Sequence, residues 1–266
     1  MASATTATTG GEAAAAGGSG AAAPVAAAAA AEAPAAAAAA AGAAGRACNL
    51  NYRLPTFDTP AGMLADMVAL TGRHARVRNY MGVIVDMRLE ATVVETELFP
   101  RGALEFYTAH NLDELDPEHV EAHAAGYRTY YNSARGGGQG DYRAGIKQKI
   151  ANVVDALTRF PASKRAVLTI PPVALDHSVD GDAKCLRELH FYLEAREPEE
   201  GEAGVATTAA PEPEALHCTG FMRAQAASIF PKNIHFIGAV MNAVARGLGK
   251  PVGTYTHIVT TLTNER

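Results

Sequence analysis

Three stretches of the chain carry apolar side chains at the three- and four-residue spacing of an amphipathic helix. The first begins at Thr59-Pro60, because threonine suits an N-cap and proline suits the first helical position, and it is expected to end at Gly72. The second covers residues 142–160, and the third ends near Gly247. The expected apolar positions are, in chain order, Met63, Met67, Val68 and Leu70; Ile146, Ile150, Val153, Val154 and Leu157; and Ile234, Ile237, Val240, Met241 and Val244.

Short apolar runs between these helices predict β-strands. The runs that we expect to form strands are residues 83–85, 165–170, 189–193, 218–223 and 255–262. Two further segments are expected to form a short helix and a flexible glycine-rich loop, namely residues 117–125 and 136–140, while residues 90–99 fit either a helix or a strand. Strands and helices mix without a regular alternation, so the pattern predicts an α+β domain.

Two segments lack the large apolar side chains that a packed core needs. Residues 1–47 consist almost entirely of Ala, Gly, Thr, Ser and Pro, and residues 194–215 are acidic and rich in Ala and Pro. Such segments cannot bury enough apolar surface to offset the entropy of ordering them. We therefore expect a disordered tail over 1–47 and one domain over 48–266, with an exposed acidic insertion at 194–215.

Charge and cysteine content narrow the class of protein. The formal net charge is −5, which argues against non-specific binding of nucleic acid. No apolar run is long enough to cross a bilayer, and the first basic residue is Arg46, too late for a signal peptide. The three cysteines, Cys48, Cys185 and Cys218, are too widely spaced for a zinc site or a disulfide framework and suit a reducing cytoplasm.

Four local matches, in one order along the chain, resemble the thymidylate synthase family. Residues 185–193, Cys-Leu-Arg-Glu-Leu-His-Phe-Tyr-Leu, resemble the segment that carries the catalytic cysteine of that family. Residues 218–223, Cys-Thr-Gly-Phe-Met-Arg, resemble the strand that follows it, and residues 230–234, Phe-Pro-Lys-Asn-Ile, resemble the opening of its central helix. Residues 161–165, Pro-Ala-Ser-Lys-Arg, resemble the Pro-x-Ser-Arg-Arg turn of the family. With weaker matches upstream, the resemblance covers roughly residues 76–262 and implies a mixed sheet packed with helices.

The resemblance implies covalent catalysis by Cys185. A thiolate that adds to C6 of a pyrimidine makes C5 carbanion-like and able to attack a one-carbon unit. Cationic neighbours favour the thiolate, and Lys184 and Arg187 flank Cys185 in the sequence, while Arg223 is expected to face it across a strand pair. From the residue alone, the alternative is that Cys185 is a small buried apolar side chain.

Four residues are implied to bind the nucleotide. Arg223 would hold the phosphate, and Lys164 and Arg165 would reach the same phosphate from the neighbouring subunit, so that the sheet forms a homodimer interface and the active sites are shared. The alternatives are a surface salt bridge for Arg223 and an ordinary basic turn for the pair. Asn233 would bond the edge of a uracil ring, or it could simply be the N-cap of its helix.

Two further matches lie near the start of the domain. Glu95, four residues before Phe99, resembles the family's acid–base glutamate, which implies that Glu95 relays protons through ordered water. A solvated helix residue is the alternative for Glu95, and Glu97 competes for the same position. Arg78 resembles the phosphate-binding arginine of an N-terminal loop.

The implied reaction is the transfer of one carbon from 5,10-methylenetetrahydrofolate to C5 of a pyrimidine nucleotide, most simply dUMP to dTMP. Several positions depart from the family. Ala224 and Ala226 stand where it has Ser and a pterin-contacting Asp, Thr263 and Glu265 replace His-x-Tyr, and the chain stops at Arg266, before the family's C-terminal lid. These departures leave two alternatives: a pyrimidine nucleotide hydroxymethylase, and a catalytically impaired nucleotide-binding member of the family.

Overall fold

The structure is a computed structural model that describes residues 54–115, 142–170, 184–195 and 214–264. All of these residues lie within the domain expected over 48–266. Several expected features lie outside the described residues: the tail over 1–47, the short helix over 117–125, the loop over 136–140 and most of the insertion over 194–215.

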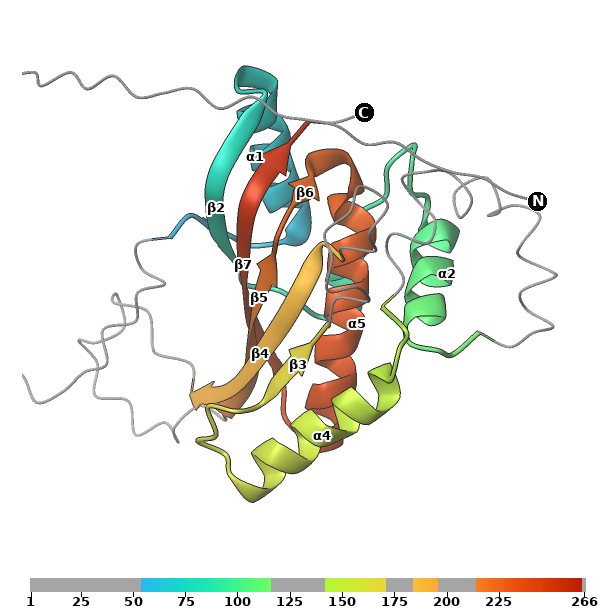
Figure 1. The fold of residues 1–266 in the computed structure, drawn as a ribbon, viewed down its shortest axis with the longest axis vertical. Helices are drawn as coiled ribbons and strands as arrows, with labels where there is room; N and C mark the ends of the chain where they lie inside the picture. The colour runs from blue at the N-terminus through green and yellow to red at the C-terminus, as the bar shows by residue number, and fades with distance from the viewer. Residues whose placement is uncertain (1–53, 116–141, 171–183, 196–213, 265–266) are drawn as a thin grey trace, which may run out of the picture. The chain divides into compact units, whose positions relative to one another are not determined.

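Within the described residues, a mixed sheet of seven strands forms the centre of the fold (Figure 1). The strand order is β1-β2-β7-β5-β4-β3, and β6 pairs with the end of β7. β7 runs antiparallel to β2 but parallel to β5, and β4 runs antiparallel to both β3 and β5. The strands are β1 Thr56–Phe57, β2 Arg76–Ile84, β3 Val167–Thr169, β4 Leu186–Ala195, β5 Glu214–Met222, β6 Gln225–Ala226 and β7 Val252–Thr263.

Helix α5 is the central helix and packs against one face of this sheet (Figure 1). Helices α2 and α4 pack on α5, and α1 lies beside β2. None of the helices in the described part of the chain is long and apolar enough to span a membrane. The helical segments are α1 Pro60–Arg73, the 3-10 turn η2 Leu89–Thr92, α2 Arg101–Asn111, α4 Ile146–Arg159, the 3-10 turn η4 Ala227–Ile229 and α5 Phe230–Leu248.

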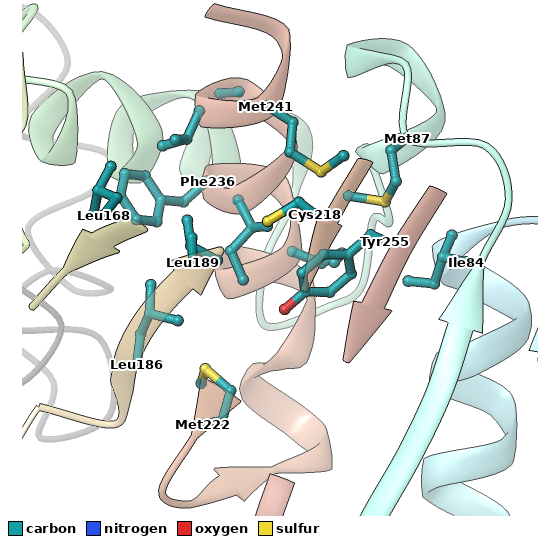
Figure 2. Close-up of a cluster of buried hydrophobic side chains, with 14 of the residues drawn as sticks. Ile84, Met87, Leu168, Leu186, Leu189, Cys218, Met222, Phe236, Met241 and Tyr255 are labelled. Atoms are coloured by element: carbon teal, nitrogen blue, oxygen red, sulfur yellow. The ribbon is translucent and has the colours of Figure 1, made fainter. Parts of the chain in front are cut away.

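The core lies between α5 and the inner face of the sheet (Figure 2). Leu189 of β4, Cys218 of β5 and Tyr255 of β7 meet Phe236 and Met241 of α5 there, and all five side chains are fully buried. These side chains come from elements far apart in the sequence, so the core fixes the order of the central strands relative to α5.

The opposite face of the sheet carries a different set of side chains, which we call the outer face: Met81, His190, Tyr192, His217 and Phe221. They alternate with core residues along their strands and are exposed or partly buried. The rings of Tyr192 and His217 stack with their centroids 5.5 Å apart. Strand pairing places Met81 and Phe221 in one row, since both are opposite Ile258.

The helices follow the predicted pattern with three differences. Helix α1 continues past Gly72 to Arg73, and Val68 is 50% exposed instead of buried. The side chain of Val68 falls outside the apolar stripe that Met63 and Met67 define four residues apart. Helix α4 begins at Ile146, four residues later than expected.

Most strands are longer than their apolar runs, but β3 is shorter than the strand expected over 165–170, because only Val167–Thr169 pair with β4. Strand β2 begins at Arg76 because its backbone pairs with β7 even where its side chains are polar and exposed, and Val85 lies beyond its end. Residues 90–99 form neither a helix nor a strand throughout, but the short 3-10 turn η2 and an irregular segment, in which the backbones of Thr96 and Phe99 bond each other. The mixed sheet packed with helices is confirmed, whereas its role as a dimer interface stays a prediction.

Candidate active site

Cys185 and Arg223 lie side by side at one end of the β4–β5 pair. Cys185 directly precedes β4 and is partly buried, and Arg223 directly follows β5 and is exposed. The backbone N–H of Arg223 donates a hydrogen bond of 2.8 Å to the carbonyl oxygen of Cys185. The expectation that Arg223 faces Cys185 across a strand pair is therefore met, and a thiol and a guanidinium share one end of the sheet.

The second described cysteine has the environment of a structural residue. Cys218 is fully buried among apolar side chains of the core (Figure 2), and this burial raises the pKa of the Cys218 thiol well above its ordinary value. A thiol in that position stays protonated and inert. The reading of a cysteine as a small buried apolar residue thus fits Cys218, while Cys185 retains access to solvent.

Lys232, which the sequence pattern did not single out, is buried in the first turn of α5. Its side chain is 4% exposed, and its Nζ lies 4.9 Å from the ring centroid of Tyr107 and 5.9 Å from that of Phe99. Burial lowers the pKa of Lys232 to about 8, and the nearby Cys185 opposes this fall. A titratable amine therefore lies within electrostatic range of the proposed nucleophile. The signal in the sequence was a lysine among apolar residues at the start of a helix, where the helix dipole disfavours a cation.

Asn233 follows Lys232 and is buried against a second amide. Its Nδ2 donates a hydrogen bond of 2.9 Å to Oε1 of Gln225, whose Nε2 donates 2.7 Å to the carbonyl oxygen of Ala226. The residue before the first turn of α5 is Ile229, so the alternative that Asn233 is the N-cap is wrong. The side chain of Asn233 is oriented by Gln225 instead, a contact that the sequence pattern did not reveal.

Tyr142 connects the elements behind this end of the sheet. Its hydroxyl accepts a hydrogen bond of 3.5 Å from the backbone N–H of Leu186, and its ring stacks on Phe236 with centroids 5.5 Å apart. Its own N–H donates 2.6 Å to Oδ1 of Asn111, whose Nδ2 donates 2.9 Å to the carbonyl oxygen of Tyr107. This network holds the start of β4, helix α2 and helix α5 in fixed positions.

Glu95 has a contact of its own at the start of α2. Its Oε2 accepts a hydrogen bond of 3.0 Å from the backbone N–H of Arg101, and its Oε1 lies 3.7 Å from Nε of Arg101. Glu95 thus satisfies one of the amides that the first turn of a helix leaves free. It lies on the irregular segment before α2, not in a helix, which corrects the alternative of a solvated helix residue. The role of Glu95 as a proton relay stays a prediction.

The remaining predicted phosphate ligands are exposed. Arg78 lies within strand β2 and not in a loop, and its Nη1 donates a hydrogen bond of 2.6 Å to Oγ1 of Thr261 on β7. Lys164 and Arg165 lie in the turn between α4 and β3, where the backbone N–H of Arg165 donates 3.2 Å to Oγ of Ser163. A role for that pair in a neighbouring subunit requires a second chain and stays a prediction.

Comparisons with known proteins give a similarity of fold but not of sequence family. No protein-family model matches the chain, and no curated protein matches it either. Among solved structures, the chain is similar to a thermostable thymidylate synthase A from Bacillus subtilis, with a TM-score of 0.45 and 13% sequence identity. The similarity covers 70% of this chain and 65% of that enzyme. Family membership does not follow from a likeness at this level, so the function proposed below rests on the residues around Cys185.

Proposed function

We propose that this protein transfers a one-carbon unit to C5 of a pyrimidine nucleotide, with Cys185 as the nucleophile. The observation that carries the proposal is the pairing of Cys185 with Arg223 at one end of the sheet, beside the buried turn of α5 that holds Lys232 and Asn233. A nucleophile, a guanidinium for a phosphate and an amide for a pyrimidine edge are the three groups that this reaction requires.

In the proposed reaction, the thiolate of Cys185 forms a bond to C6 of the pyrimidine. The electron pair of the C5–C6 double bond moves toward O4, which makes C5 nucleophilic enough to form a bond to a one-carbon electrophile. Loss of the C5 proton and cleavage of the sulfur–C6 bond then restore the double bond and the free thiol. For a methyl product, the bond between the transferred carbon and a nitrogen of the folate would also break, and a hydride from the tetrahydrofolate would reduce the carbon to a methyl group and leave dihydrofolate.

Recognition of the nucleotide follows from the chemistry of the side chains. The forked guanidinium of Arg223 suits a phosphate, and Arg78, Lys164 and Arg165 are the further cations that we propose for it. The carboxamide of Asn233 offers one donor and one acceptor, which matches N3–H and O4 of uracil and favours dUMP. Gln225 holds this carboxamide through Nδ2, so the two amides act as one unit.

Glu95 is the group that we propose as a proton relay in this reaction. Its carboxylate bonds the backbone N–H of Arg101, so it would have to release that amide before it reached a substrate. The cost of this release is modest because the carboxylate is about half exposed and can be replaced at the helix start by water.

The proposed one-carbon donor is 5,10-methylenetetrahydrofolate, which supplies an electrophilic carbon at the oxidation level of formaldehyde. The described residues fit the pyrimidine better than they fit the pterin of this donor. Ala226, in the position of the family's pterin-contacting Asp, lies in β6 and pairs with Thr263, and its methyl group offers no hydrogen bond. We therefore assign no residue to the pterin.

The outer face supports the proposal that a second copy of this chain covers the sheet. His190 and His217 each have a buried Nε2 for which the described part of the chain provides no hydrogen-bond partner. Met81 and Phe221 expose apolar side chains in the same layer. Self-association across this face would bury these groups and would bring Lys164 and Arg165 of each subunit toward the neighbouring site.

Release of tritium from 5-tritiated dUMP in the presence of 5,10-methylenetetrahydrofolate tests the proposal. We expect release with formation of dTMP, abolished by Cys185→Ser and retained by Cys218→Ala, which changes the buried cysteine instead. Both variants should keep a cooperative unfolding transition. Binding of dUMP without any release would contradict catalysis and would favour a nucleotide-binding role.

A hydroxymethyl product is the second candidate outcome of the same assay. The chain contains no tryptophan, the side chain with which the family shields the reacting carbon from water. Water that reaches this carbon yields a 5-hydroxymethyl group instead of a methyl group. Chromatography of the nucleotide product distinguishes the two, and 5-hydroxymethyl-dUMP in place of dTMP would assign the protein as a hydroxymethylase.

A further inference from the structure

Lys232 occupies a position that is unfavourable for a cation unless something compensates it. It is the third residue of α5, where the positive end of the helix dipole repels an ammonium group. It is also almost completely buried, which removes the water that would stabilise its charge. A lysine in this position cannot serve as an exposed solubilising charge, so we expect it to have a chemical role.

A series of packing contacts connects the surroundings of Lys232 with those of Cys185. Lys232 and Phe236 lie four residues apart and therefore on the same face of α5. Phe236 stacks on Tyr142, and the hydroxyl of Tyr142 accepts a hydrogen bond from the backbone of Leu186, the residue after Cys185. The buried amine and the thiol thus border the same cluster of side chains.

We propose that Lys232 is the positioning residue whose ammonium group holds the thiolate of Cys185. The S–H bond of Cys185 breaks, its proton passes to water, and the thiolate that remains pairs with the ammonium group. The proposal deepens the function proposed above because it serves the same cysteine, yet the proton transfer needs no nucleotide and can be measured without one.

The buried environment favours this pairing of thiolate and ammonium near neutral pH. The faces of Tyr107 and Phe99 stabilise an ammonium group without accepting its proton. Burial brings the pKa of Lys232 down to about 8, so the group still carries most of its charge at pH 7.

Other titratable side chains also surround Lys232 and Cys185. His235, one turn further along the start of α5, has its Nδ1 2.6 Å from Oγ1 of Thr108 on α2, and burial lowers its pKa to about 4. It is therefore neutral where the cysteine reacts. Tyr107 from α2 presents its ring to Lys232, and the basic residues Lys184 and Arg223 lie next to Cys185, the first in the chain and the second across the strand pair.

Alkylation of Cys185 by iodoacetamide between pH 5.5 and pH 9 tests the proposal on the full chain without nucleotide. Mass spectrometry of the peptide that contains residue 185 gives the rate for wild type, Lys232→Met and Lys232→Arg. We expect Lys232→Met to lower the rate at pH 7 about tenfold and to move the midpoint of the pH profile up by about one unit, since one unit corresponds to a factor of ten. Lys232→Arg keeps a cation and should restore a low midpoint.

The buried Cys218 serves as the internal control for folding, because it is alkylated only if the core opens. An unchanged profile in Lys232→Met with Cys218 still protected would overturn the proposal. If Lys232→Met exposes Cys218, the Arg variant decides, and a raised midpoint in a folded Lys232→Arg would equally overturn it. A wild-type protein that fails to release tritium from dUMP but shows the Lys232 effect would refute the proposed function and leave this inference standing.

Discussion

At the scale of single residues, the proposed site contains some residues that the sequence pattern predicted and others that only the structure identified. Cys185 and Arg223 could be paired from the sequence because two adjacent antiparallel strands place their ends together. Gln225 and Lys232 could not be assigned to the site from the sequence. Their proposed roles depend on contacts in the folded protein, which are with Asn233 for Gln225 and with Tyr107 for Lys232. Burial is a property of the packed elements and not of the local pattern.

The buried charge of Lys232 leads to a prediction about stability. Its pKa in the folded protein is about 8, below the ordinary value of 10.5, so between these values the unfolded chain binds more protons than the folded one. Stability therefore rises with pH across this window, and the charge destabilises the fold below pH 8. We expect Lys232→Met to be more stable than wild type by roughly 1–3 kcal/mol at pH 7, with the difference shrinking toward pH 10.

Urea unfolding of wild type and Lys232→Met at a series of pH values measures this difference directly. The subtraction removes the contributions of all other titrating groups that the two proteins share. A difference that grows as the pH rises would contradict the assigned direction of the Lys232 pKa.

At the scale of elements, the helical spacing of apolar residues predicted the positions of helices, because this spacing marks the helix face that is buried. The apolar stripe predicted α4 and α5 well, and Gly249 in a left-handed conformation ends α5. Strand limits were harder to predict, since backbone pairing continues past the last apolar side chain, as in β2. Val68 was misplaced because a neighbouring apolar residue on a helix need not share the buried face.

A pair of glycines tests the packing of these elements. A Cβ added to Gly220 on β5 would overlap the hydroxyl of Tyr255 on β7, whereas a Cβ added to Gly72 in α1 meets nothing within 4 Å. We expect Gly220→Ala to destabilise the protein by roughly 1–3 kcal/mol through overpacking. Gly72→Ala should instead stabilise it by up to about 1 kcal/mol, because alanine is the better helix former.

Thermal or urea unfolding of the two alanine variants gives both values in one experiment. Equal changes in the free energy of unfolding for the two variants would mean that Gly220 of β5 and Tyr255 of β7 are not in close contact.

At the scale of the whole molecule, the proposed function implies a dimer that shares its sites. We propose the outer face as the surface of this dimer, where the side chain of Phe221 is 36% exposed. We expect Phe221→Lys to weaken the dimer at least tenfold, because a charge would be buried in the interface. Glu188 is its cross-strand neighbour and can pair with the new lysine, so the monomer should tolerate the change.

Sedimentation velocity over a range of concentrations measures the association of this variant. Val68→Lys is the control, because Val68 is also an exposed apolar residue but lies on helix α1, away from the outer face. Weakening of the dimer by both variants, or by neither, would contradict an interface on the outer face.

Complementation tests whether Lys164 and Arg165 act in the neighbouring subunit. Arg165→Ala and Cys185→Ser should each lose most activity as homodimers. Mixed dimers would contain one site with both native residues, so the mixture should recover up to about a quarter of the wild-type activity. Failure of the mixed protein to recover activity, despite proven subunit exchange, would place Arg165 outside the shared site.

The central claim is that the sulfur of Cys185 bonds to C6 of a pyrimidine ring. 5-Fluoro-dUMP tests it most directly, because fluorine at C5 cannot leave as a cation and the sulfur–carbon bond should persist after one-carbon transfer. With 5,10-methylenetetrahydrofolate present, we expect peptide mass spectrometry to find the nucleotide attached to the peptide that contains residue 185, and to find none in Cys185→Ser. An adduct on another residue, or none in a wild-type protein that binds the nucleotide, would contradict the account.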